Sequence, residues 1–156
     1  MGTTTDRQAP VTQPTEAAQA SPAAPARRAA VFGRAGTQPK PWGHEVLFAL
    51  VDGCYAGKLI TVHAGHCLSC QFHREKDETL FVVSGQGVIE HGPDAEHLEA
   101  VVVRAGDTVH VAPGVVHRVT ATTELVVAEC STAAPGWRED VVRLSDAYGR
   151  AGTTVP

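Results

Sequence analysis

Residues 79–91 read TLFVVSGQGVIEH: two short runs of branched and aromatic apolar residues flank the turn Gly85-Gln86-Gly87. Such runs, bounded by glycine, are typical of two β-strands joined in a hairpin. Similar runs, separated by turns rich in Gly, Pro and Asp, follow one another from Pro41 onward. The segments expected as strands are 46–51, 56–63, 68–73, 79–84, 86–91, 98–103, 108–112, 117–121 and 124–130. This succession of short strands without helical periods predicts a single all-β domain, built as a sandwich or barrel.

The two ends of the chain differ from this strand-rich part. Residues 1–30 consist mainly of Ala, Pro, Thr and Gln, a composition that buries too little apolar surface to offset the entropy lost on ordering. We therefore expect a disordered N-terminal tail over 1–38, one domain over 39–150 and a short C-terminal tail over 151–156. A short helix is expected in 137–148 alone.

The charge balance argues against some classes of partner. The chain has 156 residues, a formal net charge of -4 and a pI of about 6.0, which does not favour nucleic acid or an anionic membrane. No run approaches the roughly 18 apolar residues of a membrane span, and residues 1–30 lack the Leu, Ile and aromatic residues of a secretory signal. A cytoplasmic location is therefore expected. Arg27 and Arg28, in an acid-poor stretch, leave a targeting peptide as the alternative.

Four cysteines raise the question of a metal site or a disulfide. Cys67 and Cys70 form a single C-x-x-C motif, without the second pair that a structural zinc site needs. If 67–73 is a strand, the two side chains also point to opposite faces. We expect Cys54, Cys67, Cys70 and Cys130 to be free thiols that are buried or half-buried.

Four other polar residues are spaced so that they can meet. Gln71 and His73 are two positions apart in one expected strand, so their side chains leave the same face. Glu78 opens the next strand after a short turn, and His117 follows a Pro113-Gly114 turn. Two neutral imidazoles and a carboxylate suit a divalent transition metal and leave coordination positions open. The spacing therefore predicts a metal site.

These segments resemble the two sequence motifs of the cupins. The matching positions are the motif glycines, two histidines and one glutamate, namely Gly65, His73, Glu78, Gly85, Gly106, Gly114 and His117. The resemblance implies a double-stranded β-helix, or jelly-roll barrel, with a metal bound by His73, Glu78 and His117. Gln71 stands where the family has its first histidine and is expected as a weaker fourth ligand. The metal would be Zn, Mn, Fe, Co or Ni.

A narrower resemblance covers most of residues 40–150. The segments 40–43 (KPWG), 68–73 (LSCQFH), 139–143 (EDVVR) and 146–150 (DAYGR) are similar to the C-terminal cupin domain of type II phosphomannose isomerases. This resemblance implies a metal-dependent aldose–ketose isomerase, similar to mannose-6-phosphate isomerase, with a sugar or sugar phosphate as substrate. Lys76 stands where that family has an arginine in the turn between the metal ligands.

An aldose–ketose isomerase needs a Lewis acid, a base and cationic groups for the phosphate. Lys76 and Lys58 are the expected catalytic residues, and Lys58 and Arg143 the expected substrate-binding residues. Lys58 shares strand parity with Ile60, so both side chains leave the same face. The alternative for Lys76 is a solvated turn residue. The alternative for Arg143, and for Arg150, is an ion pair that fixes the C-terminal segment, with Glu139, Asp140 or Asp146 as the acidic partner.

Two other functions stay open at this point. One is an iron-dependent dioxygenase acting on a small metabolite, because two histidines and one carboxylate also suit iron(II). The other is a non-catalytic cupin that binds a sugar or metabolite, in which Gln71 and Lys76 mark the loss of an active site. A homodimer is also expected, since the edge strands of small barrels are often covered by a partner.

Overall fold

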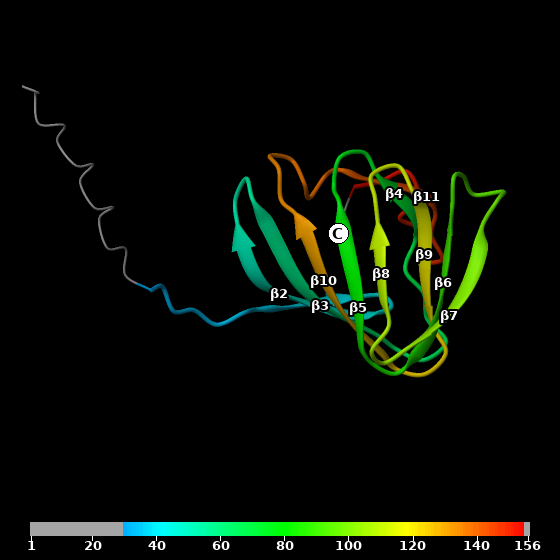
Figure 1. Ribbon diagram of the computed structural model, residues 1–156, viewed down its shortest axis with the longest axis horizontal. Coiled ribbons are helices and arrows are strands. Elements are labelled where there is room, and N and C mark those ends of the chain that lie inside the picture. Colours follow the sequence, from blue (N-terminus) through cyan, green and yellow to red (C-terminus); the bar gives the residue numbers. More distant parts are fainter. Residues whose placement is uncertain (1–29, 155–156) are drawn as a thin grey trace, which may run out of the picture. The chain divides into compact units, whose positions relative to one another are not determined.

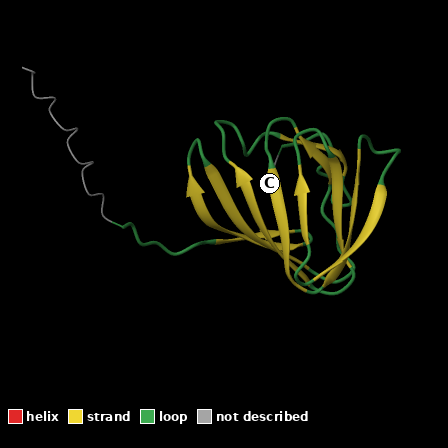
Figure 2. Ribbon diagram, in the orientation of Figure 1, coloured by secondary structure: helices red, strands yellow, loops and turns green. Residues whose placement is uncertain are grey.

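The computed structural model describes residues 30–154, and within this range it contains eleven β-strands and no helix. The strands are β1 Thr37–Lys40, β2 Gly43–Val51, β3 Tyr55–Val62, β4 Cys70–His73, β5 Glu78–Ser84, β6 Gln86–Gly92, β7 Glu99–Arg104, β8 Thr108–Val111, β9 Val116–Ala121, β10 Leu125–Thr132 and β11 Val141–Ser145. They form two antiparallel sheets that face each other (Figure 1, Figure 2). The prediction of an all-β domain is confirmed.

The order of the strands differs from their order in the sequence. One sheet has the order β1-β2-β3-β10-β5-β8 and the other β11-β4-β9-β6-β7. Strands that follow one another in the chain therefore often lie in different sheets, as β3 and β4 or β10 and β11 do. This crossing between two facing sheets is the expected jelly-roll arrangement. As a result, side chains from β3, β4, β5, β9 and β10 line one space between the two sheets.

The core lies between the two sheets and is built from alternate positions of the strands. On β10, Leu125 and Val127 are buried, and Val126 between them is only half-buried, as the period of two in a strand requires. Glu129 continues the inward series and is buried as well. The apolar core consists of Trp42, Ile60, Val62, Leu80, Val82, Ile89, Val103, Val119, Ala121, Leu125 and Val127.

The turn between β5 and β6 depends on a glycine. Gly85 has a φ of 86°, a backbone conformation that other residues rarely adopt. A Cβ atom at this position would also lie 2.0 Å from the carbonyl oxygen of Glu124. Both constraints exclude a side chain, so the glycine in the quoted stretch is required for the hairpin.

The helix expected in 137–148 is wrong. Residues 141–145 instead form β11, which pairs with β4 so that Val141 lies opposite His73. Val141 is buried in this pairing, and burial against a sheet edge outweighs the local preference for a helix. The bounds of all nine expected strands differ from the observed ones by up to three residues. The largest differences are that β2 starts at Gly43 rather than at residue 46, β4 starts at Cys70 rather than at residue 68, and β10 continues to Thr132 rather than ending at residue 130.

Of the expected disordered tail over 1–38, residues 1–29 lie outside the described residues. β1 starts at Thr37, within the range 1–38, and pairs with β2. The four cysteines are free, as expected. The expectation of burial is wrong for Cys54 and Cys130, which are exposed, because Cys54 lies in a turn and Cys130 points outward from β10.

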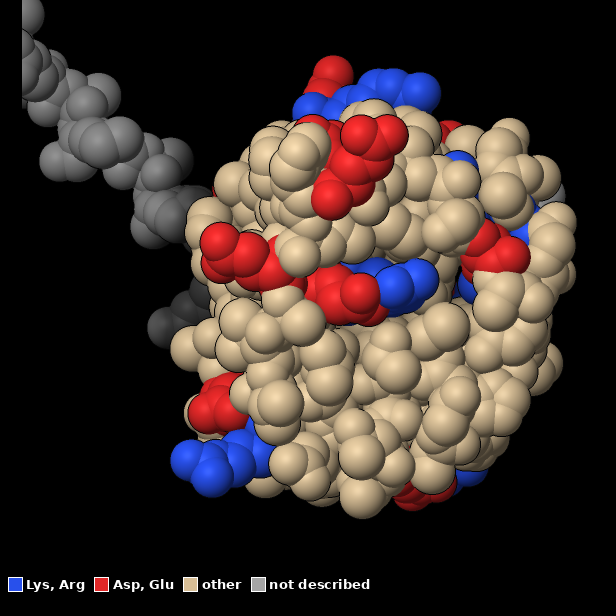
Figure 3. All heavy atoms as spheres, turned by 90° about the vertical axis from the view of Figure 1, so that its right-hand side faces the viewer, with Lys and Arg blue, Asp and Glu red and all other residues tan. Residues whose placement is uncertain are grey.

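The surface carries charges of both signs. Figure 3 shows one face of the molecule, on which Lys and Arg side chains lie in small groups beside Asp and Glu, with uncharged surface between the groups. This face therefore has no extended basic patch. Residues 30–154 contain no helix long and apolar enough to cross a membrane.

Candidate metal centre and its cavity

The three expected metal ligands come from three strands. His73 ends β4, Glu78 begins β5 and His117 is the second residue of β9. Gln71 lies opposite His117 in the pairing of β4 with β9. The backbone N–H of Gly114 donates to the carbonyl oxygen of His73 at 2.8 Å, which ties the turn before β9 to the end of β4. Sheet pairing thus brings two segments far apart in the sequence to one place.

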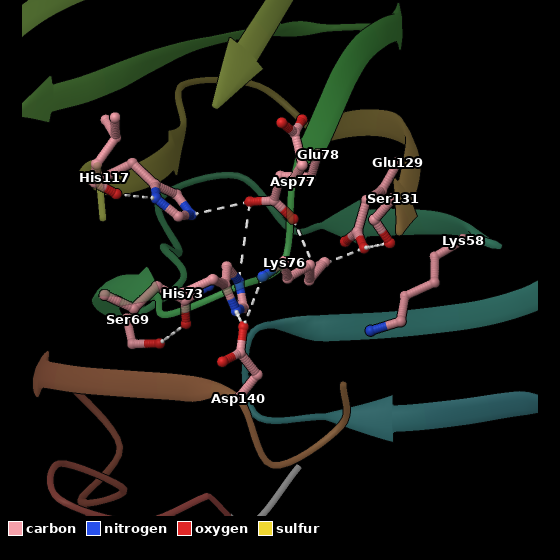
Figure 4. Close-up of polar contacts among 12 residues, drawn as sticks. Lys58, Ser69, His73, Lys76, Asp77, Glu78, His117, Glu129, Ser131 and Asp140 are labelled. Atoms are coloured by element: carbon pink, nitrogen blue, oxygen red, sulfur yellow. Dashed lines mark hydrogen bonds and ion pairs between the residues drawn. The ribbon is translucent and has the colours of Figure 1, made fainter. Parts of the chain in front are cut away.

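The donor atoms of His73, Glu78 and His117 lie within 4.8 Å of one another, and all three side chains are buried (Figure 4). Glu78 Oε1 lies 3.2 Å from His117 Nε2 and 3.9 Å from His73 Nε2. Neither ring nitrogen of His73 has a hydrogen-bond partner within the described residues. A buried polar group without a partner is costly, whereas a metal ion would use the imidazole lone pair. The three residues therefore fit a divalent transition metal.

The ring of His117 is oriented by the backbone. Its Nδ1 lies 3.0 Å from the carbonyl oxygen of Val115. Because a carbonyl only accepts hydrogen bonds, Nδ1 donates to Val115, and Nε2 is the ring nitrogen that faces Glu78. Nε2 is therefore the nitrogen through which His117 would bind a metal ion.

Asp140 organises the turn between the ligands. Its carboxylate accepts hydrogen bonds from the backbone N–H groups of Arg74, Glu75 and Lys76, the shortest at 2.9 Å from Lys76. The same carboxylate lies 3.7 Å from Nδ1 of His73. Asp140 precedes β11 directly, so the C-terminal strand also positions the turn that joins His73 to Glu78.

Lys76 lies between two buried carboxylates. Its side chain is 5% exposed, and Nζ lies 2.5 Å from Glu78 Oε2 and 2.7 Å from Glu129 Oε1 (Figure 4). Ser131 donates a hydrogen bond of 3.0 Å to the same oxygen of Glu129. The alternative of a solvated Lys76 is therefore wrong.

The charges of this cluster determine one another's protonation. Burial alone would lower the pKa of Lys76, but the carboxylates of Glu129 and Glu78 raise it above its ordinary value. Burial alone would raise the pKa of Glu78, but the hydrogen bond with His117 and the charge of Lys76 lower it well below its usual range. Burial, together with the charge of Lys76, lowers the pKa of His73 to about 4. At neutral pH the lysine and Glu78 are charged and His73 is neutral, as metal ligation requires.

A cavity of about 130 Å³ opens beside the ligands. His73 and Lys76 line it, together with the residues expected to bind substrate, Lys58 and Arg143. Lys58 faces inward with Ile60, as their shared strand parity predicts. Other residues that line the cavity are Lys40, Trp42, Glu45, Glu129, Trp137 and Arg150.

Gln71 and Arg143 lie opposite each other in the pairing of β4 with β11, and both line the cavity. The amide oxygen of Gln71 accepts a hydrogen bond of 2.6 Å from Ser69. Arg143 donates from Nη1 to the carbonyl oxygen of Thr153 at 2.7 Å. The acidic partner considered for Arg143 is not found among the described residues, and the ion pair of the C-terminal segment is formed by Arg150 and Asp146 at 2.7 Å.

Sequence reasoning missed Glu129 and Asp140. A signal for Glu129 was present, because it shares strand parity with the apolar Leu125 and Val127, and a carboxylate on a core-facing position calls for a partner. Asp140 lies in the segment 139–143 that carries the narrower resemblance, but nothing in the sequence indicated its hydrogen bonds to the turn before Glu78. Its role depends on β11, and that segment was expected to contain a helix.

Residues 58–130 match the family model described as the cupin domain. The matched range includes Gln71, His73, Glu78 and His117. A search of curated protein sequences finds no match.

Three solved structures with a similar fold come from different proteins. One is CapF with the inhibitor 3-isopropenyl-tropolone, with a TM-score of 0.58 and 16% identity over 72% of this chain and 35% of CapF. Another is KdgF from Halomonas sp., with a TM-score of 0.55 and 16% identity over 63% of this chain and 87% of KdgF. The third is the Bacillus subtilis oxalate decarboxylase studied for its Mn(II) centres, with a TM-score of 0.57 and 20% identity over 69% of this chain and 29% of the decarboxylase. The chain thus spans less than half the length of CapF and of oxalate decarboxylase. At these identities the likeness concerns the fold. Residues 58–130 thus match a cupin domain, and the chain shares the fold of these structures.

Proposed function

We propose that the protein is a metal-dependent enzyme acting on a sugar or sugar phosphate, as an aldose–ketose isomerase similar to mannose-6-phosphate isomerase. The observation that carries the proposal is the buried cluster of His73, Glu78 and His117, beside a cavity lined by Lys58 and Arg143. Zn, Mn, Fe, Co and Ni all suit these ligands, with Gln71 as a weaker fourth. When bound, the metal would supply a Lewis acid that polarises the carbonyl group of the substrate.

The cluster around Lys76 supports a role as a fixed positive charge. Glu129 and Glu78 raise the pKa of Lys76, so it keeps its proton at neutral pH. We therefore assign Lys76 to orienting a substrate oxygen and keeping Glu78 ionised, and not to taking a proton from carbon.

The proton transfer between adjacent carbons falls to other groups on the cavity wall. Lys58 Nζ lies 3.6 Å from Glu45 Oε2, and its side chain is 18% exposed, so it can reach a substrate in the cavity. Glu129 lines the same cavity and is a second candidate base. Arg143 is assigned to binding the substrate.

The experiment is an isomerisation assay on purified protein whose metal content has been measured by elemental analysis. Mannose 6-phosphate and fructose 6-phosphate are the first substrates to test. We expect turnover that is lost on chelation and restored by one of the five metals. A stoichiometric metal without isomerisation of any hexose phosphate would refute the isomerase and leave the metal site standing.

The donor set itself favours a second candidate. Two imidazoles and one carboxylate with open positions are also the ligands of iron(II) oxygenases. Oxygen uptake by the iron(II)-loaded protein with a small metabolite would identify this function. The Mn(II) centres of the similarly folded oxalate decarboxylase support manganese as another metal to test. Ligand binding without any turnover would indicate a binding protein.

We also propose a cytoplasmic location and a homodimer. The outer face of the six-stranded sheet supports the dimer, because Phe48, Phe81 and Val83 are exposed there. Light scattering coupled to size-exclusion chromatography measures the oligomeric state, and a monomer at micromolar concentration would contradict the dimer.

A further inference from the structure

The cavity contains a second group of charged side chains, which within residues 30–154 make no hydrogen bond or ion pair with His73, Glu78 or His117. Besides Lys76 and Arg138, four cations that line the cavity form this group. Lys40 ends β1, Lys58 lies in β3, Arg143 lies in β11, and Arg150 follows it. The fold therefore gathers positive charge in one cavity from segments that are distant in the sequence.

Two of these cations have hydrogen-bond donors that remain unused. Arg143 Nη1 donates to the carbonyl oxygen of Thr153, and Arg150 Nη2 donates to Asp146 Oδ2, both at 2.7 Å. These contacts fix one side of each guanidinium group. The Nε of each arginine is buried and has no partner among residues 30–154. Buried N–H groups are normally paired with a hydrogen-bond acceptor, and these two Nε–H groups are exceptions among the described residues.

Positive charge also exceeds negative charge in this group. Lys40 and Lys58 share one carboxylate, that of Glu45, at 3.2 and 3.6 Å. Arg150 has its single acidic partner, and Arg143 has none within the described residues. The group therefore has two positive charges in excess. Burial, and next the charge of Arg150, lower the pKa of Arg143, whereas Asp146 and Glu45 act in the opposite direction.

We propose that Lys40, Arg143 and Arg150 form a subsite for a doubly charged oxyanion group of the substrate, such as a phosphate monoester. A guanidinium group presents a planar set of donors that matches phosphate and carboxylate oxygens, and a dianion balances the excess charge. The subsite rests on the proposed function and deepens it, because it specifies that the substrate carries an anionic group. The hydroxyl oxygens of a neutral sugar could accept from the Nε–H groups, but a neutral sugar would leave the two excess positive charges of this group uncompensated.

The test uses the full-length protein freed of metal with EDTA, titrated with inorganic phosphate at constant ionic strength. The Nε–H signals of Arg143 and Arg150 are followed by ¹H–¹⁵N NMR, which reports on the subsite without any turnover. We expect both signals to shift with saturation. Methyl phosphate and acetate are titrated in parallel: tighter binding of the phosphates assigns a phosphate group, and tighter binding of acetate assigns a carboxylate. No shift up to tens of millimolar of any of the three would overturn the subsite.

Variants locate the binding. Arg143→Gln and Lys40→Gln should each weaken phosphate binding by roughly tenfold or more, the usual effect of losing a charged hydrogen bond. Arg118→Gln is the matched control, because Arg118 makes a bidentate ion pair with Glu90 in another part of the sheet and lies outside the cavity lining. Equal weakening in Arg118→Gln and Arg143→Gln would mean that binding is non-specific, which would overturn the proposal. If Arg143→Gln does not fold, Arg143→Lys keeps the charge and removes the planar donor set, and it should still weaken binding.

The subsite and the proposed function can fail independently. Phosphate binding in the absence of metal tests the subsite alone. Metal content and turnover test the proposed enzyme, whatever the result of the phosphate titration.

Discussion

Glu78 divides its two carboxylate oxygens between Lys76 and the histidines. Oε2 lies 2.5 Å from Nζ of Lys76, whereas Oε1 lies 3.2 Å from Nε2 of His117. The ammonium group thus occupies one oxygen and leaves the other directed at the ligand set. The charge of Lys76 and the metal site are therefore connected through one side chain.

Replacing Lys76 by Met should lower the free energy of unfolding by about 3–5 kcal/mol, the usual cost of leaving buried charges without a partner. Glu78 and Glu129 would both lose their counter-ion. Urea denaturation followed by circular dichroism measures the change. The double variant Lys76→Met/Glu129→Gln should recover part of the loss, because one unpaired carboxylate is removed.

The control for this variant is Lys58→Met, which removes a lysine from the same cavity. Lys58 is more exposed and lies 3.6 Å from its carboxylate partner. We expect a loss below about 1 kcal/mol, as for weak ion pairs in contact with solvent. Similar losses for the two lysines would contradict the special position of Lys76.

His73→Ala and His117→Ala should each abolish stoichiometric metal binding, because two remaining ligands do not compete with water for a divalent ion. Gln71→Ala should weaken binding less, since an amide oxygen is a poorer ligand than imidazole. Elemental analysis after gel filtration measures the metal content. His110→Ala is the control: His110 is an exposed histidine paired with Asp77, and its loss should leave the metal content unchanged. Full metal content in the double histidine variant would show that the ion binds elsewhere.

The metal-free protein should lose stability in mild acid through His73. Its folded-state pKa is about 4, below the value of about 6.5 for an unfolded chain. Between these values the unfolded state binds more protons, so the free energy of unfolding falls as the pH decreases from 6.5 to 4. The loss should approach about 3 kcal/mol. Denaturation curves across this range measure it for the protein and for His73→Gln, in which the slope should become smaller. An unchanged slope would assign the acid sensitivity to other groups, and His97→Gln, at an exposed histidine, is the control.

Asp146→Asn should loosen the C-terminal segment. Burial alone would raise the pKa of Asp146, but hydrogen bonds from the Arg150 side chain and from the backbone N–H groups of Tyr148 and Arg150 lower it. Amide exchange at Tyr148 and Arg150 should become faster, and the free energy of unfolding should fall by about 1–3 kcal/mol.

Asp94 offers a matched control for that substitution. Its carboxylate accepts the backbone N–H groups of Glu96 and His97 in the same manner, but it lies in an exposed loop. Asp94→Asn should leave the free energy of unfolding almost unchanged. Equal effects of the two substitutions on the free energy of unfolding would mean that the burial of Asp146 contributes nothing to stability.

The strand pattern and the ligand spacing could be predicted from the sequence because both depend on local periodicity. Gln71 and His73 share a face through the period of two in β4, and Glu78 opens the following strand. The partners of Lys76 could not be predicted in the same way. Glu129 reaches Lys76 only because β10 pairs with β5, and such long-range pairing leaves no periodic signal.

The C-terminal part of the domain shows a second limit of prediction from the sequence. Residues 137–148 have no strong periodicity, and the partner that makes Val141 part of a strand is the open edge of β4. Asp140 acquires its contacts through the same pairing. The ion pair of Arg150 with Asp146 was among the alternatives because the two residues lie close in the sequence.

The pairing of β11 with β4 has a consequence for the synthesis of the chain. All the expected metal ligands lie before residue 118, but β4, which carries Gln71 and His73, gains one of its two neighbours only from Val141–Ser145. Until those residues leave the ribosome, that edge of β4 has unpaired backbone groups and the turn after His73 lacks Asp140. Assembly of the ligand set is thus expected to be a late event in the folding of the nascent chain.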